Sequence, residues 1–317
     1  MKKIIFGFTD EFRLPDAAWK QLKENFQDSY HFYTMDESTT EDLSRAEAYV
    51  GWPSDQTLEQ MKSLRWIQLP SAGANHFTKN PKIAPDVIVT NSKGVYNVSG
   101  SEHILALVLA FTRQIPQYAR QTANHEWRML EEVRQVEGST ATIIGLGNIG
   151  RAAAKRLHAF GAHVLGVKRS IGEIPENIDQ LFSLDNMTEA LEKSDFVINV
   201  LPLTEETADL FQKKVFDSFK PGSVFINVGR GQSVVEKDLI DALRSGRLGG
   251  AALDVTAVEP LPPENLLWTF DNVLITSHSL GLSPGRLERH LSLLTKNLKN
   301  FAQGENLENV VDRELGY

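Results

Sequence analysis

The sequence contains no cysteine among its 317 residues. This absence excludes disulfide bonds, thiolate nucleophiles and zinc sites built on thiolates, and we expect no metal site. Basic residues are in the minority, since 33 lysines and arginines stand against 41 aspartates and glutamates, for a formal net charge of −8. Proteins that bind nucleic acid or membrane surfaces normally need a basic face, so neither kind of partner is expected.

Long hydrophobic runs are also missing. The longest one, residues 104–111, is far shorter than the ~20 residues that a membrane span requires. At the N-terminus, Asp10 and Glu11 interrupt a short apolar stretch before a secretory signal could be completed. With 41% hydrophobic and 23% charged residues the composition is typical of a globular protein, and we expect a cytoplasmic one.

What the sequence does contain is two series of strand-like runs that alternate with helical patterns. The first ninety residues include the runs IIFGF, HFYTM, AEAYVGW, RWIQL and VIVTNS. Strands that alternate with helices predict a parallel sheet with helices on its faces. From residue 140 a second series follows with six apolar strand-like runs, a number that fits one doubly wound nucleotide-binding domain.

The two series are separated by the stretch GSEHILALVLAFTRQIPQYARQTANHEW, which we interpret as one long helix with Ser101 as its N-cap. The amphipathic tail from residue 287 is expected to pack on the first domain. The sequence therefore predicts a two-domain α/β protein. A flavodoxin-like substrate domain would comprise residues 1–98 and 286–317, and a Rossmann-type dinucleotide-binding domain would comprise residues 99–285.

A glycine motif stands between the first strand and the first helix of the second series. Gly145, Gly147 and Gly150 have the spacing G-x-G-x-x-G, which allows a tight turn, close approach to a pyrophosphate and close packing of helix on strand, in that order. Such a motif alone is a weak signal, but here a strand, a helix and a second strand surround it. We predict a dinucleotide site that also includes Asn148 and Ile149 at the helix start, where phosphates bind.

The next strand, HVLGVKRS, ends in basic and hydroxyl side chains where an NAD-binding fold usually carries an acid. Arg169 offers a planar fork of donors that suits a phosphate, and Lys168 and Ser170 add a charge and a hydroxyl. The alternative is that all three are ordinary solvated residues at a strand end. Because the acid is absent and the bases are present, we predict that NADP(H) is preferred, with NAD(H) possible.

Each of the last three strand-like runs is followed by one conspicuous polar residue: Arg230, Glu259 and His278. Loops at the carboxyl ends of strands converge on the ligand in open α/β sheets, so these residues can meet. An arginine that binds a carboxylate, a histidine that supplies a proton and a glutamate that orients the imidazole suit reversible reduction of a 2-oxo acid. Singly, each is more often a structural residue or a surface charge.

Several stretches resemble one family closely. NVLPLTEETADLF, INVGRGQSVVEKDLIDALRSGRLGGAALDVTAVEPLP and LWTFDNVLITSHS, together with GLGNIG, are similar to D-isomer-specific 2-hydroxyacid dehydrogenases over roughly residues 140–285. The motifs SAGA and NSKGVYNVSGSEHILALVLA extend the likeness more weakly into the first domain. The branch that the sequence resembles is the glyoxylate/hydroxypyruvate reductase type that prefers NADP.

The resemblance implies roles for individual residues. Arg230, Glu259 and His278 match the catalytic residues of the family, and Asp254 matches the aspartate that contacts the nicotinamide carboxamide. The backbone at Ser71, Ala72 and Gly73 matches the loop that holds the substrate carboxylate. Further cofactor contacts are expected from residues on the loops that follow the strands: Leu201, Pro202, Thr207, Val228, Gly229 and Gly281.

Three other residues have competing interpretations. Trp52 is either a packing residue or a wall of the substrate pocket, and His103 is expected to have a structural or hinge role. Trp127 lies where the family forms its dimer contacts, so it is an interface residue of a homodimer or a core residue. The residue before His278 is Ser277, where the family often has proline, and this departure leaves the shape of that loop open.

The small-molecule partner is a 2-oxo or 2-hydroxy acid whose side chain the sequence leaves open. Formate enzymes of the family generally carry glutamine in place of the glutamate, so Glu259 disfavours that branch. A phosphoglycerate-type enzyme remains an alternative, although no regulatory domain is expected after residue 317. The least favoured alternative is a nucleotide-sensing binding module with the same fold.

Overall fold

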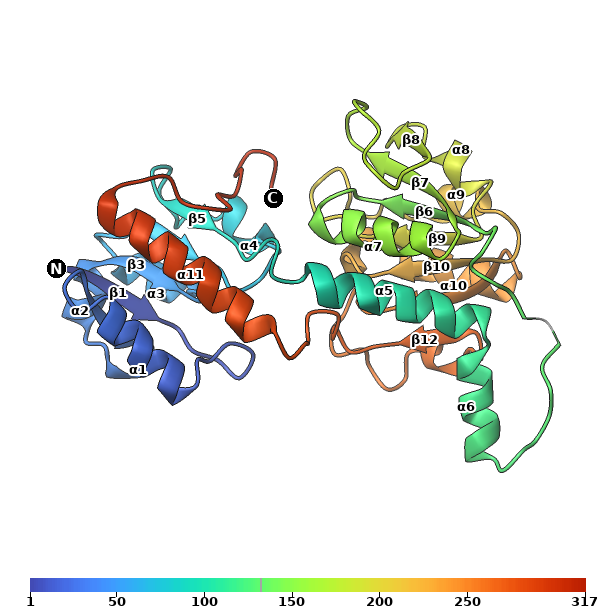
Figure 1. The fold of residues 1–317 in the computed structure, drawn as a ribbon, viewed down its shortest axis with the longest axis horizontal. Helices are drawn as coiled ribbons and strands as arrows, with labels where there is room; N and C mark the ends of the chain where they lie inside the picture. Colours follow the sequence, from blue (N-terminus) through green and yellow to red (C-terminus); the bar gives the residue numbers. More distant parts are fainter. Residues whose placement is uncertain (132) are drawn as a thin grey trace. The chain divides into compact units, whose positions relative to one another are not determined.

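The computed structural model describes residues 1–131 and 133–317, and these form two compact units (Figure 1). Unit 1 comprises residues 1–95 and 283–317, and unit 2 comprises residues 96–282. The expected domain limits were at 98/99 and 285/286. Among the described residues, none of the helices has the length and hydropathy needed to cross a bilayer.

Unit 1 is built around a five-stranded parallel sheet with the order β2-β1-β3-β4-β5. This is the flavodoxin-like order, as predicted. All five of the expected strand-like runs form strands: β1 (Lys2–Phe6), β2 (Tyr30–Thr34), β3 (Ala46–Val50), β4 (Trp66–Gln68) and β5 (Ile88–Thr90).

Helices cover both faces of this sheet because successive side chains of a strand point to opposite sides. Ile4 and Phe6 of β1 pack in one cluster with residues of α1 (Asp16–Asn25) and α11 (Arg286–Gln303). Ile5 packs in another cluster with Leu43 of α2 (Thr40–Arg45). The amphipathic tail thus forms α11, whose Leu298 is fully buried in unit 1. The short helices α3 (Asp55–Gln60) and α4 (Asn75–Thr78) complete the unit.

Unit 2 contains a seven-stranded parallel sheet with the order β12-β11-β10-β9-β6-β7-β8, which confirms the predicted doubly wound class. The strand β8 (Gln180–Ser183) was not expected, because it is a short edge strand with little apolar character. The six expected strands are β6 (Thr140–Ile144), β7 (His163–Lys168), β9 (Phe196–Asn199), β10 (Ser223–Asn227), β11 (Leu248–Leu253) and β12 (Val273–Ile275).

The two faces of this sheet bury separate cores. Ile143 of β6 faces a cluster that includes residues of α5 (Asn97–Thr112) and α7 (Asn148–Ala159), and these two helices lie side by side in Figure 1. Ile144 faces the opposite cluster. That second cluster is completed by α8 (Thr188–Leu191), α9 (Lys213–Asp217) and α10 (Glu236–Arg244).

The predicted long helix is two helices, and its predicted N-cap is wrong. The first helix, α5, begins at Asn97, so Ser101 lies inside it and its hydroxyl donates to the carbonyl of Asn97 at 2.5 Å. Gln114 has a left-handed backbone with φ of 55° and separates α5 from α6 (Ile115–Ala123). The hydroxyl of Ser101 bonds back into the preceding turn, which is the other position where serine is tolerated in helices.

Candidate active site

The glycine turn after β6 has the geometry that a dinucleotide requires. Gly145 has φ of 103°, a conformation that side chains disfavour, and a Cβ on Gly150 would lie 2.1 Å from the carbonyl oxygen of Gly145. A Cβ on Gly147 would meet nothing within 4 Å, so this glycine faces open space at the start of α7. Two glycines are therefore needed for the turn and for packing, and the third leaves room for a ligand at the helix N-terminus.

The sheet of unit 2 changes its winding direction between β6 and β9, since the chain passes from β6 outward to β7 and β8 and then returns to β9. Ligands of open α/β sheets bind outside the carboxyl ends of strands at such a point. The predicted cofactor residues of this unit all lie at the carboxyl ends of its strands or shortly after them: after β6 and at the start of α7 (Gly145, Gly147, Asn148, Ile149, Gly150), at the end of β7 (Lys168, Arg169, Ser170), and after β9 (Leu201, Pro202, Thr207), β10 (Val228, Gly229), β11 (Asp254) and β12 (Gly281).

The basic end of β7 has an acidic neighbour that was not foreseen. Nη2 of Arg169 lies 2.9 Å from Oε2 of Glu206, and both side chains are largely exposed. Glu206 belongs to the turn after β9, and hydrogen bonds of the Thr207 hydroxyl stabilise this turn. The Thr207 hydroxyl donates to the carbonyl of Pro202 at 2.7 Å and accepts from the amide of Thr204 at 2.7 Å. This stabilised turn therefore places the Glu206 carboxylate beside Arg169, the side chain predicted to bind a 2′-phosphate.

Arg230 stands on a loop that a buried polar network supports. Asn199 at the end of β9 donates to the side chains of Asn227 and Ser233, each at 2.9 Å. Asn227 and Ser233 in turn donate to the carbonyl oxygen of Arg230 at 3.1 and 2.7 Å. Burial lowers the pKa of the Arg230 guanidinium, and the nearby Glu259 carboxylate opposes that shift. The arginine keeps its charge because its ordinary pKa is so high.

Sequence reasoning missed the network of Asn199, Asn227 and Ser233, although a signal was present. The strands β9 and β10 both end in asparagine after an apolar run, and both asparagines are almost fully buried. A buried amide must be hydrogen-bonded, so a pair of them at the ends of neighbouring strands indicates a built structural network.

His278 and Glu259 form a pair. Nδ1 of His278 lies 2.9 Å from Oε2 of Glu259, and the other oxygen of Glu259 accepts from the amide of Thr256 at 3.0 Å. The imidazole remains 53% exposed. With Nδ1 occupied by the glutamate, Nε2 is the ring nitrogen left to meet a substrate, which is the arrangement of a histidine that exchanges a proton.

The backbone of His278 has φ of 49°, a left-handed conformation that is uncommon for residues other than glycine. Asp254 stabilises this turn by accepting hydrogen bonds from three of its backbone amides. Its carbonyl accepts from the amide of His278 at 2.8 Å, and its carboxylate accepts from the amides of Ser279 at 2.9 Å and Leu280 at 3.2 Å. The Asp254 side chain is 1% exposed.

The buried Asp254 carboxylate stabilises the loop that carries His278 by accepting its hydrogen bonds. Burial by itself raises the pKa of Asp254, but hydrogen bonds from His103, Thr276 and the Ser279 amide outweigh burial, and the pKa lies below its ordinary value. The carboxylate is therefore an ionised acceptor inside the protein. The carboxamide contact implied by the family resemblance would come in addition to these bonds.

In unit 1 the predicted carboxylate loop is held by side chains around it. Nε1 of Trp52 donates to the Ser71 hydroxyl at 3.1 Å, and that hydroxyl donates to the carbonyl of Gly73 at 2.7 Å. Asn91 donates to the carbonyl of Ala72 at 2.8 Å. Within the described part of the chain, the amides of Ala72 and Gly73 donate to no protein acceptor. Two amides are thus left for an anion, and Trp52 both packs and positions the loop.

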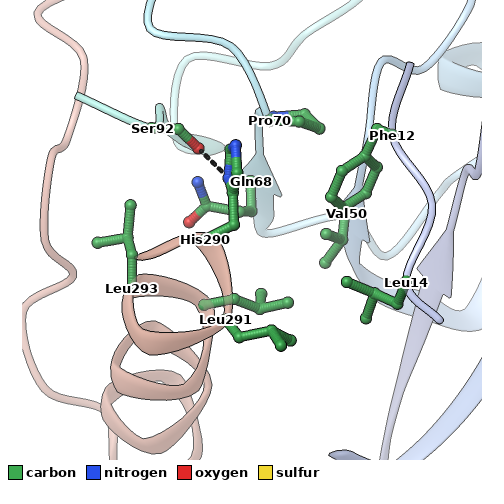
Figure 2. Close-up of a pocket in the computed structure, with 10 residues that line it drawn as sticks. Phe12, Leu14, Val50, Gln68, Pro70, Ser92, His290, Leu291 and Leu293 are labelled. Carbon is green, nitrogen blue, oxygen red and sulfur yellow. Dashed lines mark hydrogen bonds between the residues drawn. The ribbon is translucent and has the colours of Figure 1, made fainter. Parts of the chain in front are cut away.

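Beside this loop lies a small cavity of about 10 Å³, room for one water molecule. Figure 2 shows His290 of α11 pointing to Ser92, whose hydroxyl lies 3.2 Å from Nδ1, with Phe12 and Leu14 on the other side. Burial, together with the charges of two neighbouring arginines on α11, lowers the pKa of His290 to about 4. His290 is therefore neutral near pH 7.

Comparison with known proteins identifies the family and supports the fold. Residues 105–279 match the family described as D-isomer specific 2-hydroxyacid dehydrogenase, NAD binding domain. Glyoxylate/hydroxypyruvate reductase B of Escherichia fergusonii is 33% identical over 279 residues, which are 84% of this chain and 85% of that protein. D-3-phosphoglycerate dehydrogenase of Archaeoglobus fulgidus is 30% identical over 260 residues, 81% of this chain, but this chain spans only 49% of its length.

A solved structure extends the likeness over the whole chain. The NADPH-dependent glyoxylate/hydroxypyruvate reductase from Sinorhizobium meliloti, in complex with NADP and sulfate, superposes with a TM-score of 0.86. It is 27% identical to this chain and the match covers 100% of both chains.

Proposed function

This chain belongs to the D-isomer specific 2-hydroxyacid dehydrogenase family, and from that premise we propose that it reduces a small 2-oxo acid to the D-2-hydroxy acid with NADPH as the preferred donor. The family makes it an NAD(P)-dependent D-2-hydroxyacid dehydrogenase with a nicotinamide cofactor. The observation that carries the proposed reaction is the pairing of His278 with Glu259 at 2.9 Å, on the same edge of the sheet as Arg230.

The residues present fit a dinucleotide. Gly147 leaves open space at the N-terminus of α7, where backbone N–H groups and the helix dipole favour a pyrophosphate. The loops after β7 and β9 would hold the adenosine end, and the loops after β10, β11 and β12 the nicotinamide end. When bound, the nicotinamide supplies or takes the hydride at the carbon that bears the substrate oxygen.

The protein's side chains bind the substrate carboxylate and transfer the proton. Arg230 binds the substrate carboxylate and polarises the carbonyl, since its guanidinium is charged and partly buried. His278 donates the Nε2 proton to the carbonyl oxygen as the carbon gains its hydride, and takes the proton back in the reverse direction. Glu259 holds Nδ1 and so keeps Nε2 aimed at the substrate. In unit 1, the amides of Ala72 and Gly73 are two backbone donors that can bind an anion.

The preference for NADPH rests on Lys168, Arg169 and Ser170. The guanidinium of Arg169 can donate two N–H groups to a 2′-phosphate. The two residues directly after β7 include no acid that could accept hydrogen bonds from the ribose hydroxyls. Glu206 opposes the preference, because the 2′-phosphate must take Arg169 from its carboxylate partner. We therefore expect a moderate preference rather than exclusion of NADH.

The function is tested by following NADPH oxidation with glyoxylate, hydroxypyruvate and bulkier branched or aromatic 2-oxo acids. We expect turnover with at least one of them, and a lower KM for NADPH than for NADH. No oxidation with any 2-oxo acid would contradict the reaction and favour the nucleotide-sensing module. A lower KM for NADH would contradict only the cofactor preference.

A phosphorylated hydroxyacid is the second candidate substrate. It is favoured by the 30% identity to the D-3-phosphoglycerate dehydrogenase of Archaeoglobus fulgidus, of which this chain spans about half. Including 3-phosphohydroxypyruvate in the panel separates the two. A higher kcat/KM with the phosphorylated acid than with hydroxypyruvate would favour this alternative.

We further propose that the protein is a homodimer. The segment after α6 exposes large apolar side chains, among them Trp127, which is fully exposed, and Met129. Exposed apolar groups in such a cluster are typical of an interaction surface, and a second copy of the chain is the proposed occupant. A molar mass of one chain in solution at micromolar concentration would contradict this. The cytoplasmic location stays a prediction.

A further inference from the structure

His103 of α5 reaches the loop that carries His278. Its Nε2 lies 3.1 Å from the Thr276 hydroxyl and 3.4 Å from Oδ1 of Asp254, and its side chain is 19% exposed. The three residues stand on α5, after β12 and after β11, far apart in the sequence. Neither the glycine motif nor the Arg230, Glu259 and His278 set involves His103, so its contacts need a separate explanation.

The hydrogen-bond chemistry of this cluster decides where the protons are. The Thr276 hydroxyl lies 2.6 Å from Oδ1 of Asp254, and an ionised carboxylate only accepts, so the hydroxyl donates its single proton there. The same hydroxyl can then only accept from His103. Nε2 of His103 therefore carries a hydrogen in every protonation state that is compatible with this contact.

The Asp254 carboxylate connects this donor to the turn at His278. It accepts from the amides of Ser279 and Leu280, the two residues that follow His278, while its carbonyl accepts from the amide of His278 itself. A left-handed conformation is unfavourable for a residue other than glycine. The bonds around the turn must offset this cost for His278 to keep φ at 49° and stay 2.9 Å from Glu259.

We propose that His103 is a positioning residue for the reaction: its Nε2–H group orients Thr276 and Asp254, and these fix the left-handed turn that aims His278. The inference rests on the proposed function, since it presumes that His278 transfers the proton. His103 acts through two other residues and touches neither substrate nor cofactor in this role. The sequence predicted a structural or hinge role for His103, and the proposal specifies the part of the structure on which it acts, the turn at His278.

The decisive comparison is between His103→Leu and His103→Gln. Leucine keeps comparable bulk without a donor, whereas the Gln amide can place an N–H near the position of Nε2. We expect His103→Leu to lower kcat by about 10- to 100-fold, because small misplacement of a reacting group is costly, with KM for NADPH changed less than about two-fold. His103→Gln should restore most of kcat. In the leucine variant, the primary isotope effect with NADPH deuterated at the transferred position should rise.

Glu102→Gln is the matched control, because Glu102 lies next to His103 on α5 and pairs at 3.7 Å with Arg156 instead. Its kcat should stay within about two-fold of the wild type. Unchanged kcat in His103→Leu would overturn the proposal. Equal losses in the Leu and Gln variants would also overturn it, since packing rather than hydrogen-bond donation would then be responsible.

Thr276→Val and Thr276→Ser give a second route if the leucine variant does not fold. Valine should reproduce the loss of kcat and serine should not, and equal kcat in these two variants would overturn the proposal. His278→Ala separates this inference from the proposed function. Retained turnover in His278→Ala would overturn both, whereas an inactive His278→Ala beside a fully active His103→Leu would overturn the inference alone.

Discussion

The loops at the carboxyl ends of the two sheets have different chemistry. In unit 2 these loops carry the ionisable side chains of Arg230, Glu259 and His278, and buried polar groups hold the loops in place. In unit 1 the corresponding loop offers the backbone of residues 71–73, with an indole and neutral side chains around it. Both sheets are parallel and doubly covered, so the difference arises in the loops.

This contrast supports the proposal that the proton-transferring side chains belong to unit 2, whereas unit 1 offers backbone donors for an anion. Side chains that exchange protons or bind charge must keep a set geometry, and the bonds that hold them stand on neighbouring strands. Backbone amides that bind an anion require only that hydrogen bonds fix the conformation of their own loop. Substitutions in unit 2 should therefore lower kcat, whereas substitutions in unit 1 should alter KM or stability.

The largest effect is expected for His278→Ala. Loss of the proposed proton donor should lower kcat by about 10² to 10⁴ with little change in cofactor binding, as measured by steady-state kinetics and NADPH titration. His163→Ala is the matched control, because His163 also pairs with a carboxylate, at 3.2 Å from Asp179, but stands at the opposite end of its strand. Near-normal turnover in His278→Ala would remove the histidine from the mechanism.

Arg230→Lys tests whether charge alone is enough in unit 2. Lysine keeps the positive charge but loses the planar fork, so we expect kcat/KM for the 2-oxo acid to fall about 10²-fold. Arg244→Lys, on the exposed face of α10, should leave kcat/KM unchanged. A lysine variant with wild-type kcat/KM would show that bidentate binding is not required.

His290 in unit 1 should affect stability rather than turnover. Its pKa is about 4 in the folded protein, below the ordinary 6.5, so the unfolded chain binds a proton first as the pH falls. The stability that this histidine supplies is fully present above pH 6.5 and is lost toward pH 4, by about 3 kcal/mol at most. His290→Asn should be less sensitive to acid in urea unfolding between these pH values. Equal pH dependence in both proteins would contradict the burial of a neutral imidazole.

Glu206→Gln should sharpen the cofactor preference. Without the Glu206 carboxylate, the 2′-phosphate has one competitor fewer for Arg169, so we expect KM for NADPH to fall about five-fold while KM for NADH changes less than two-fold. Asp209→Asn removes one negative charge from the same loop and is the control for the effect of net charge. A higher KM for NADPH in Glu206→Gln would mean that Glu206 orients Arg169 for the phosphate instead of competing with it.

The smallest effect is expected for Trp52→Phe in unit 1. The ring is kept but the N–H that donates to Ser71 is lost, so KM for the 2-oxo acid should rise about three-fold, with kcat nearly unchanged. Trp268→Phe, which loses an N–H bonded to the carbonyl of Pro262, is the matched control. A large loss of kcat in Trp52→Phe would break the contrast between the two units.

Much of the fold could be predicted from the sequence because its signals are local. Apolar runs located eleven of the strands, and the roles of Gly145 and Gly150 are set within their own turn. The strand β8 escaped because an edge strand of four residues is half exposed and needs few apolar side chains. The break at Gln114 escaped because the amphipathic pattern continues through it.

The candidate site was harder to predict because its contacts join distant residues. Topology places the end of β9 beside the end of β10, and only then do Asn199 and Asn227 meet. In the same way, the partners of Arg169 and His103 become visible only in three dimensions.

Periodicity and short-range geometry were enough to predict from the sequence the succession of strands along the chain, the glycine turn and the polar residues that follow the strands. Tertiary structure decided which of those residues touch. It brought His278 to Glu259, enclosed the turn of His278 with Asp254, and set Glu206 against Arg169. The reason is physical: a hydrogen bond or ion pair depends on separations of about 3 Å, and only the packed sheets set such separations between segments far apart in the chain.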